Sequence, residues 1–280
     1  MTNTTALFLM DRETTDETIT DFAEAARPTN THVSCLVLGL APQVPLGGFG
    51  IPPYGAMDVP DDWFEILKME RKRENTRVQE IEQMLARTNT SGDVQSAFTV
   101  QNEIKHHVAR RARVCDLAYA APNLRESPVF REAAAGVLFD SPIGLVVNCP
   151  LPAEPQAVFI AWDSSNAAAR AVHAALPIIK EAKDVFVGCF DPKTTPTADG
   201  INPGSGLASW LSHYGCKVTV NQYPSGGQEL GQCIQDRARE IGADLVVMGA
   251  YGHSRMIQAV FGGTSRSMME QTELPVFFAH

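Results

Sequence analysis

Two apolar runs that each end in aspartate decide the fold. Ala6-Leu7-Phe8-Leu9-Met10-Asp11 lies near the start of the chain, and Val158-Phe159-Ile160-Ala161-Trp162-Asp163 lies past its midpoint. A helix-like segment follows each run, at 16–26 and at 165–182. Apolar runs without alternation are typical of strands that are buried on both faces. The sequence therefore predicts two copies of a unit that begins with a buried strand and a helix.

The repeat continues through the rest of each copy. Further apolar runs follow at 32–38 and 184–190, CDLAYAA (115–121) matches ADLVVMGA (243–250), and IGLVVN (143–148) matches LPVFFAH (274–280). Strands that alternate with helices indicate right-handed parallel crossovers. We therefore predict the α/β class, with two tandem doubly wound, Rossmann-like domains of five parallel strands each.

A proline-rich segment separates the two copies. Residues 148–155 read NCPLPAEP, and three prolines make this a short, stiff linker. The predicted domains are 1–150 and 156–280. The first domain carries an insertion, the Pro/Gly loop 41–62, which leads into a long charged helix from Trp63 to about Arg87.

Composition excludes several classes of protein. The 280 residues are 44% hydrophobic and 20% charged, as in globular proteins and unlike disordered or coiled-coil chains. A net charge of −9 offers no positive field for a nucleic-acid backbone. No apolar run approaches the ~20 residues of a membrane helix, and the N-terminus lacks the basic start of a signal peptide. We expect a cytoplasmic protein with neither nucleic acid nor membrane as partner.

The six cysteines are spaced singly and form no CxxC pair. This spacing predicts reduced core residues and no structural metal. They are Cys35, Cys115, Cys149, Cys189, Cys216 and Cys233.

The segment with the most chemical information is MGAYGHSRMIQAVFGGTSR, residues 248–266. Its glycines are Gly249, Gly252, Gly262 and Gly263, and the first of them ends a predicted strand at the carboxyl edge, where open α/β sheets bind ligands. Glycine lets backbone N–H groups approach a phosphate, and the helix expected at 267–272 would add a positive dipole end. A purely structural role as turn and cap residues is the alternative.

This pattern resembles the universal stress protein family. The carboxyl end reads strand–G–x2–G–x9–G–(G/S/T), then a short helix and a last strand that opens with Pro275-Val276, and the acidic residue in IAWDSSNAAARAVHAALPII (160–179) fits the same family. The resemblance covers Ala157 to His280. It implies an adenine nucleotide alpha hydrolase-like fold in its tandem two-domain form.

The resemblance also implies a ligand, ATP with Mg²⁺, and a set of residues to hold it. Asp163 would contact the adenine or ribose, and the backbone near Cys189 would read the adenine edge. The residues implied for the ribose and phosphates are Gly249, Gly252, Gly262, Gly263, Thr264 and Ser265. Gly263 departs from the family, which has Ser or Thr directly after the third glycine, so one hydroxyl contact is lost. Arg255 and Arg266 are candidates to neutralise phosphates, or else surface residues.

The first copy lacks the glycine pattern. After its fourth strand it reads APNLRESPVFREAAAGVLFDSP (121–142), in which Pro122 and Asn123 replace the glycine-rich start of the loop. Asp11 is retained. We interpret this domain as a degenerate copy, so that the chain has one candidate site and not two.

No motif supplies a nucleophile with a general base, so we predict binding of an adenine nucleotide in a stress-response or regulatory role, without strong catalysis. A dimerisation scaffold that binds no nucleotide, and weak ATP hydrolysis or nucleotidyl transfer, are the alternatives. The last strands of the two copies, 143–148 and 276–280, would be exposed edges. We expect them to pair the halves as a pseudo-dimer within the chain, and expect two chains to form a homodimer.

Overall fold

The computed structural model describes residues 4–43, 61–148, 155–195, 200–250 and 263–280. The elements of the first half, in chain order, are β1 (Thr5–Met10), α1 (Asp16–Ala26), β2 (His32–Leu40), α2 (Asp61–Arg87), β3 (Gly92–Thr99), α3 (Gln101–Ala112), β4 (Leu117–Ala120), the 3-10 turn η1 (Pro122–Glu126), α4 (Phe130–Asp140) and β5 (Gly144–Val147). Those of the second half are β6 (Ala157–Ala161), α5 (Asn166–Ile179), β7 (Asp184–Phe190), α6 (Ser205–His213), β8 (Val218–Tyr223), α7 (Leu230–Glu240), β9 (Leu245–Gly249), α8 (Gly263–Glu270) and β10 (Val276–Ala279).

The predicted α/β alternation is confirmed in both halves. The strand order is β3-β2-β1-β4-β5 in the first half and β8-β7-β6-β9-β10 in the second, and neighbours within each half are parallel. In each half the order reverses beside the first strand, as in other doubly wound folds.

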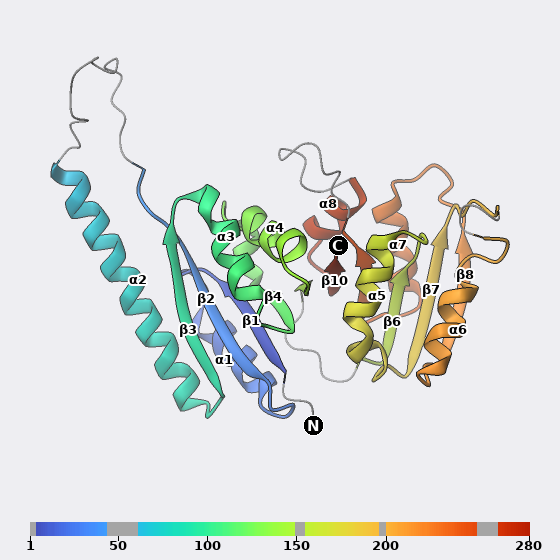
Figure 1. Ribbon diagram of the computed structural model, residues 1–280, viewed down its shortest axis with the longest axis horizontal. Coiled ribbons are helices and arrows are strands. Elements are labelled where there is room, and N and C mark those ends of the chain that lie inside the picture. The colour runs from blue at the N-terminus through green and yellow to red at the C-terminus, as the bar shows by residue number, and fades with distance from the viewer. Residues whose placement is uncertain (1–3, 44–60, 149–154, 196–199, 251–262) are drawn as a thin grey trace, which may run out of the picture.

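The two halves share one sheet. β10 pairs with β5 in antiparallel register, with Phe277 opposite Val146, and the ten strands run continuously across the molecule (Figure 1). Gly144 makes the junction close, because a Cβ there would lie 2.1 Å from the Phe277 ring. The predicted pairing of the halves through their last strands is confirmed. Both strands are now interior, so a homodimer, which remains a prediction, would need another surface.

Helix α5 shows how the sequence specifies its elements. The side chain of Ser165 accepts a hydrogen bond from the N–H of Ala168, and this cap satisfies one of the unpaired donors at the helix start. The stripe of Ala168, Val172, Ala175 and Ile179 is buried. This spacing places the four side chains on the helix face that packs on the sheet.

The insertion helix α2 brings an acid into the interior. Glu74 is 2% exposed, and its carboxylate accepts a hydrogen bond of 2.8 Å from Ser96 Oγ. It packs over Gly39, where a Cβ would lie 2.9 Å from either carboxylate oxygen. Burial raises the pKa of Glu74, and the bond from Ser96 offsets only part of this effect.

Replacement of Glu74 by Gln is expected to stabilise the protein at neutral pH. The folded state holds the Glu74 proton more tightly than the unfolded chain does. Stability is therefore lost as pH rises from the ordinary carboxyl pKa of about 4.3 through the raised value. Urea denaturation of Glu74→Gln should show a higher midpoint than wild type at pH 7, with the difference shrinking toward pH 4.3. Glu82→Gln, an exposed acid on the same helix, is the matched control and should leave the midpoint unchanged.

Candidate nucleotide site

The carboxyl ends of β6, β7 and β9 meet at one edge of the sheet. Ala161 of β6 is in register with Gly188 of β7 and with Met248 of β9. The residues that follow these three positions therefore lie side by side. Asp163 comes two residues after Ala161, and Gly249 directly after Met248.

Asp163 is exposed at this edge, in front of helix α5. Its Oδ1 accepts a hydrogen bond of 3.1 Å from the N–H of Ser165, across Ser164, whose φ is +60°. This tight turn fixes the carboxylate beside the helix start. The sequence-predicted acid thus lies where the first strand of the second half ends.

A cavity of about 510 Å³ adjoins this turn. Its described lining residues are Trp162, Ser164, Gly200, Ile201, Asn202, Gly204, Ser205, Gly206 and Leu207. The volume lies within the range of about 300 to 1,000 Å³ of small-molecule sites. The backbone N–H of Trp162 donates to Gly188 O at 2.9 Å, which holds this aromatic residue at the strand end.

The sequence analysis missed Trp162 and Asn202 as members of the site. An aromatic residue directly before the acid was a signal that could have identified Trp162. Asn202 had no comparable signal, because it lies in a turn-rich connection with several polar residues.

Cys189 can contribute only its backbone. Its side chain is buried at 1% exposure, and its Sγ lies 3.1 Å from the position that a Cβ on Gly204 would take. Gly204 has a φ of +79° and directly precedes helix α6. A side chain at this position would be strained and would also approach Val220 Cγ1 to 2.9 Å. The glycine lets α6 begin close to β7, beside the cavity.

Gly249 is required by packing. A Cβ there would lie 2.6 Å from Ala168 N and 2.7 Å from Ala167 C, because the first turn of α5 crosses the end of β9. This steric reason accounts for the glycine without a ligand. It also places the start of α5 at the candidate site. Gly252 and Gly262 lie outside the described residues.

Helix α8 begins at Gly263 and ends at Glu270, so the predicted helical run at 267–272 was wrong at both ends. Its first turn contains Thr264, which is half-buried, and Ser265, which is 1% exposed. Exposure favours Thr264 as the hydroxyl that a ligand can reach. Gly263 is exposed, and a Cβ there would meet no atom within 4 Å.

Arg266 forms a surface ion pair within α8. Its Nε lies 2.6 Å from Glu270 Oε1, and its side chain is 71% exposed. The surface interpretation of Arg266 therefore holds in this structure. Arg255 lies outside the described residues.

The corresponding acid of the first half is enclosed by its own neighbours. Asp11 Oδ1 accepts hydrogen bonds from Asn123 Nδ2 at 2.7 Å and from the N–H of Glu13 at 3.1 Å. Thr14, which is 1% exposed, donates to Asn123 Oδ1 at 2.9 Å. Asn123 stands where the second half has a glycine-rich loop start. Its side-chain amide thus donates to the carboxylate oxygen of Asp11 that a ligand would otherwise use as an acceptor.

Helix α2 packs beside the residues that follow this acid. It connects β2 to β3 as α6 connects β7 to β8, but it is 27 residues long where α6 has nine. Arg12 pairs with Glu70 of α2, and this contact lowers the pKa of the Glu70 carboxyl. Arg77 of α2 donates a hydrogen bond of 2.6 Å to Thr14 O and forms an ion pair with Asp16 at 2.8 Å. A pocket of about 490 Å³ remains beside this network, and six of its eight described lining residues are charged: Arg12, Glu13, Lys72, Arg73, Arg77 and Glu80. The cavity of the second half has no charged residue in its described lining.

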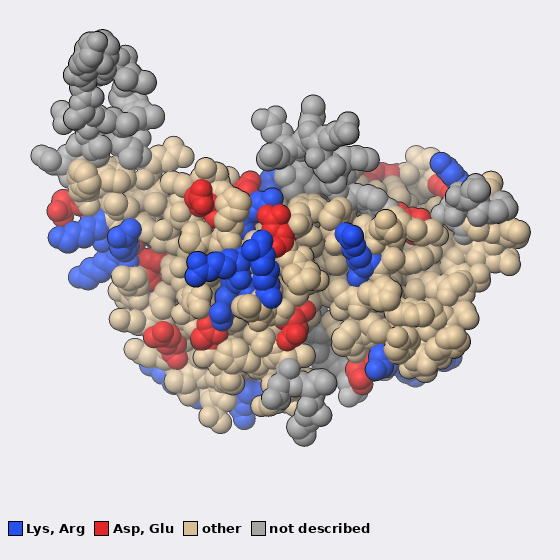
Figure 2. All heavy atoms as spheres, viewed as in Figure 1, with Lys and Arg blue, Asp and Glu red and all other residues tan. Residues whose placement is uncertain are grey.

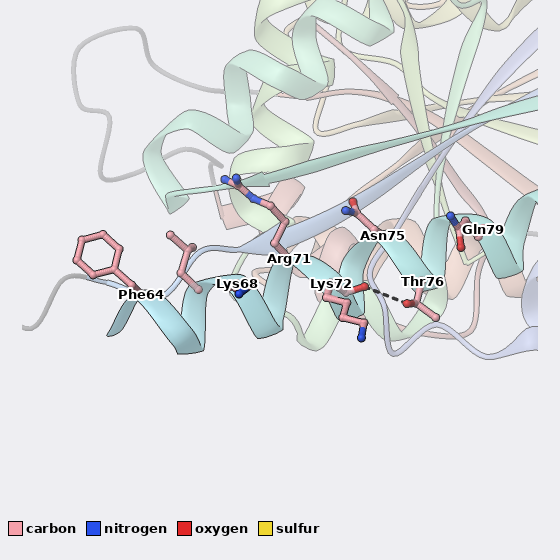
Figure 3. A pocket seen from close by; sticks show the side chains of 8 residues that line it. Phe64, Lys68, Arg71, Lys72, Asn75, Thr76 and Gln79 are labelled. Atoms are coloured by element: carbon pink, nitrogen blue, oxygen red, sulfur yellow. Dashed lines mark hydrogen bonds between the residues drawn. The ribbon is translucent and has the colours of Figure 1, made fainter. Parts of the chain in front are cut away.

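A groove of about 480 Å³ on the outer side of α2 is a weaker candidate. Its described lining residues include Phe64, Lys68, Arg71 and Lys72, and all of them come from this one helix (Figure 3). Figure 2 shows blue Lys and Arg atoms at the left of the molecule, where α2 lies in Figure 1. Small-molecule sites need polar groups that converge from several elements, which the described residues do not supply here.

A hydroxyl, an imidazole and a carboxylate come together at the amino ends of β2 and β3. His32 Nδ1 lies 2.8 Å from Ser91 Oγ, and Nε2 lies 3.0 Å from Asp93 Oδ1. Arg111 binds both oxygens of Asp93 at 2.6 Å and donates to Ser34 Oγ. These residues line none of the cavities described above. We therefore interpret the group as a structural network that joins β2, β3 and α3.

The described cysteines are buried and free, as predicted, and burial raises the pKa of the Cys35 thiol to about 12. Cys149 lies outside the described residues. Within the described part of the chain, no group of three or more His, Cys, Asp or Glu side chains is placed to hold a metal ion. None of its helices combines the length and apolar character needed to cross a membrane.

A known protein family matches the last part of the chain. The sequence profile of the Universal stress protein family matches residues 226–280, which run from the approach to α7 through the glycine segment to β10. Residues 226–280 are thus similar in sequence to the universal stress protein family. No curated protein sequence matches the chain.

Solved structures extend the likeness in fold to the whole chain. A universal stress protein from Archaeoglobus fulgidus DSM 4304 has a TM-score of 0.65 and 17% identity, over 98% of this chain and 95% of its own. A Pseudomonas aeruginosa UCBPP-PA14 protein, proposed to be a universal stress protein, has a TM-score of 0.59 and 15% identity, over 99% and 93%. Both halves of the chain therefore share the fold of these two proteins.

The closed state of the first half predicts that Asn123 stabilises the fold. Asn123→Ala would leave Asp11 and the buried Thr14 without their shared partner, so we expect a loss of about 1 to 3 kcal/mol in the free energy of unfolding. Urea denaturation measures this loss. Gln101→Ala, which removes an exposed side-chain amide from the same half, should cost less than about 0.5 kcal/mol. Equal stability of the two variants would show that the network contributes nothing.

Proposed function

We propose that the second half, residues 156–280, binds an adenine nucleotide, ATP with Mg²⁺, at the carboxyl edge of its strands, and that the first half, residues 1–150, is a degenerate domain that binds none. The observation that carries this proposal is the contrast between the halves. Beside Asp163 there is a cavity of about 510 Å³ with an aromatic residue and no charged residue in its described lining. Asp11 accepts a hydrogen bond from Asn123, and the pocket of about 490 Å³ near it is lined by Arg12, Glu13 and mostly charged side chains of α2.

The residues around the cavity fit the parts of a nucleotide. The ring of Trp162 offers an apolar face for a base, and the carboxylate of Asp163 can accept hydrogen bonds from ribose hydroxyls. The start of α8 provides backbone N–H groups, a positive dipole end and the Thr264 hydroxyl for phosphate oxygens. Gly252 and Gly262 would add backbone donors, as their place in the family pattern implies.

We further propose that binding, and not turnover, is the activity, in a cytoplasmic stress-response or regulatory role. Around the cavity the described residues include no nucleophile that is hydrogen-bonded to a base, which covalent catalysis would need. The second candidate is a dimerisation scaffold without nucleotide. The absence of a hydroxyl at residue 263 favours it.

Calorimetric titration with ATP tests the proposal. Asp163→Ala removes the acceptor beside the cavity and should weaken binding about tenfold, which corresponds to about 1.4 kcal/mol. Asp11→Ala is the matched control, because it removes the equivalent acid of the closed half, and it should leave affinity unchanged. Wild-type protein that gives neither heat nor a thermal shift with ATP would favour the scaffold. Equal losses in the two variants would refute the assignment to one half.

The departure at residue 263 gives a second test. Gly263→Ser places the hydroxyl of the family pattern at the first position of α8, and the structure has room for it. One hydrogen bond to a charged phosphate oxygen should tighten ATP binding about tenfold. Gly263→Ala separates the hydroxyl from the effect of a Cβ on the helix. An equal gain in the Ala variant would mean that helix stability, and not the hydroxyl, improves binding.

A further inference from the structure

Helix α8 has eight residues, and such a short helix is marginal without outside support. The last carbonyls of a helix have no partner within it and need donors from elsewhere. Gln271, directly after α8, donates from Nε2 to Met268 O at 3.3 Å. The N–H of Gln271 donates to Ser267 O at 3.2 Å, and a further donor to this helix end comes from the first half of the chain.

Two first-half side chains hold the end of α8. Arg125 of η1 donates from Nη2 to Met269 O and from Nη1 to Asn148 Oδ1. Asn148, which follows β5, donates from Nδ2 to Gln271 O at 2.9 Å and to Leu274 O at 3.0 Å. A cation at a helix C-terminus is also favoured by the helix dipole. Burial of Arg125 lowers the pKa of its guanidinium, which is the cost of placing this charge between the halves.

The start of the glycine segment is held from the first half as well. His280 Nδ1 lies 2.7 Å from the carbonyl of Ala250, the residue after β9. The His280 ring packs edge-on against Phe139 of α4, with ring centroids 4.8 Å apart. First-half residues thus contact the chain on both sides of the segment 251–262. Before it, Phe139 packs on the His280 ring that is bonded to Ala250, and after it, Arg125 is bonded to α8.

We propose that the degenerate half positions the nucleotide site of the other half, with Arg125 as the principal positioning residue. This inference rests on the proposed function, because the site in question is the one assigned to ATP. Arg125 caps α8 at its C-terminus, and Asn148 holds the turn that follows the helix. Together they fix the place and direction of the N-terminus of α8, where Gly263 and Thr264 would meet the phosphates. Arg125 itself touches no ligand in this arrangement.

The place of Arg125 in the chain explains why a first-half residue can act in this way. η1 follows β4 as the glycine segment follows β9, so Arg125 lies in the connection that would carry a phosphate loop in a binding copy. With that loop replaced, its side chain reaches across the β5–β10 junction. The degenerate sequence therefore has a function of its own.

The test is Arg125→Met in the full chain, with Arg113→Met as the matched control. Arg113 Nε caps the end of α4 by donating to Asp140 O at 2.9 Å, so the control removes the same kind of cap within the first half. Two measurements are made: ATP affinity by calorimetry, and amide hydrogen exchange of residues 263–272 without nucleotide.

Arg125→Met is expected to weaken ATP binding about tenfold, within the factor of about 5 to 150 that couplings between sites usually reach. It should also speed exchange in α8 several-fold. Arg113→Met should change neither quantity, even if it lowers the melting temperature. Arg125→Lys keeps a charged donor for Met269 O and should recover part of the affinity.

The two proposals fail in different ways. Unchanged exchange in Arg125→Met would show that Arg125 does not hold α8, and would overturn the inference whatever the affinity. Faster exchange with unchanged ATP affinity would also overturn it, while leaving the proposed function intact. If wild-type protein binds no ATP, the proposed function fails, and the positioning role toward a nucleotide fails with it.

Discussion

The antiparallel pairing of β5 with β10 is the contact on which the rest of the molecule depends. Each half ends in an apolar strand with one unpaired edge, and the pairing satisfies both edges at once. The Phe277 ring lies against Gly144, so the two backbones approach closely where the halves meet. This register also brings the residue after β5, Asn148, to the turn that follows α8. The cross-half contacts at the candidate site are consequences of one strand pair.

The two halves differ mainly in the connection between their second and third strands. In the second half this connection ends in the nine-residue helix α6, which directly follows Gly204 and leaves a cavity beside Trp162. In the first half it ends in the 27-residue helix α2, whose Glu70 and Arg77 interact with the residues after β1. A longer helix with more charges thus gives the pocket beside β1 a charged lining, whereas the described lining of the cavity beside β6 is uncharged. The same fold therefore presents surfaces of different chemistry in its two copies.

Much of the fold could be predicted from the sequence, because buried strands and amphipathic helices have local signatures. The stripe from Ala168 to Ile179 and the aspartates after β1 and β6 were predicted correctly. The bounds of α8 were not, since Gly263, Thr264 and Ser265 have weak helix propensity and tertiary contacts decide where the helix begins.

The site could be predicted only in part, because several of its determinants are contacts between distant residues. Gly249 is required by the backbone of α5, which lies some eighty positions earlier in the chain. The bond between Arg125 and Met269 crosses 144 positions. No local pattern contains such information. The hydrogen bond between Asn123 and Asp11 is likewise a contact between residues that are distant in sequence. The sequence predicted that the first half is degenerate, but it did not predict that Asn123 is the partner of its acid.

Covalent linkage of the halves makes the two proposed roles possible, in which the second half binds the nucleotide and the first half positions helix α8. In a symmetric homodimer both subunits have the same sequence and present the same surface. A residue in the loop after the fourth strand that caps the partner's helix is therefore present in both subunits, including the one that needs this loop for a ligand. An arginine in the loop after the fourth strand would then remove both sites while it supported both helices. In a tandem chain the two loops have separate sequences, and one can become a support without loss of the other. Linkage also keeps the partner at a high effective concentration, so a junction built on a single strand pair and a few side-chain bonds is sufficient. An arginine in the loop after the fourth strand can cap α8, while the glycine segment is kept in the other copy, only where the two copies are linked in one chain and have separate sequences.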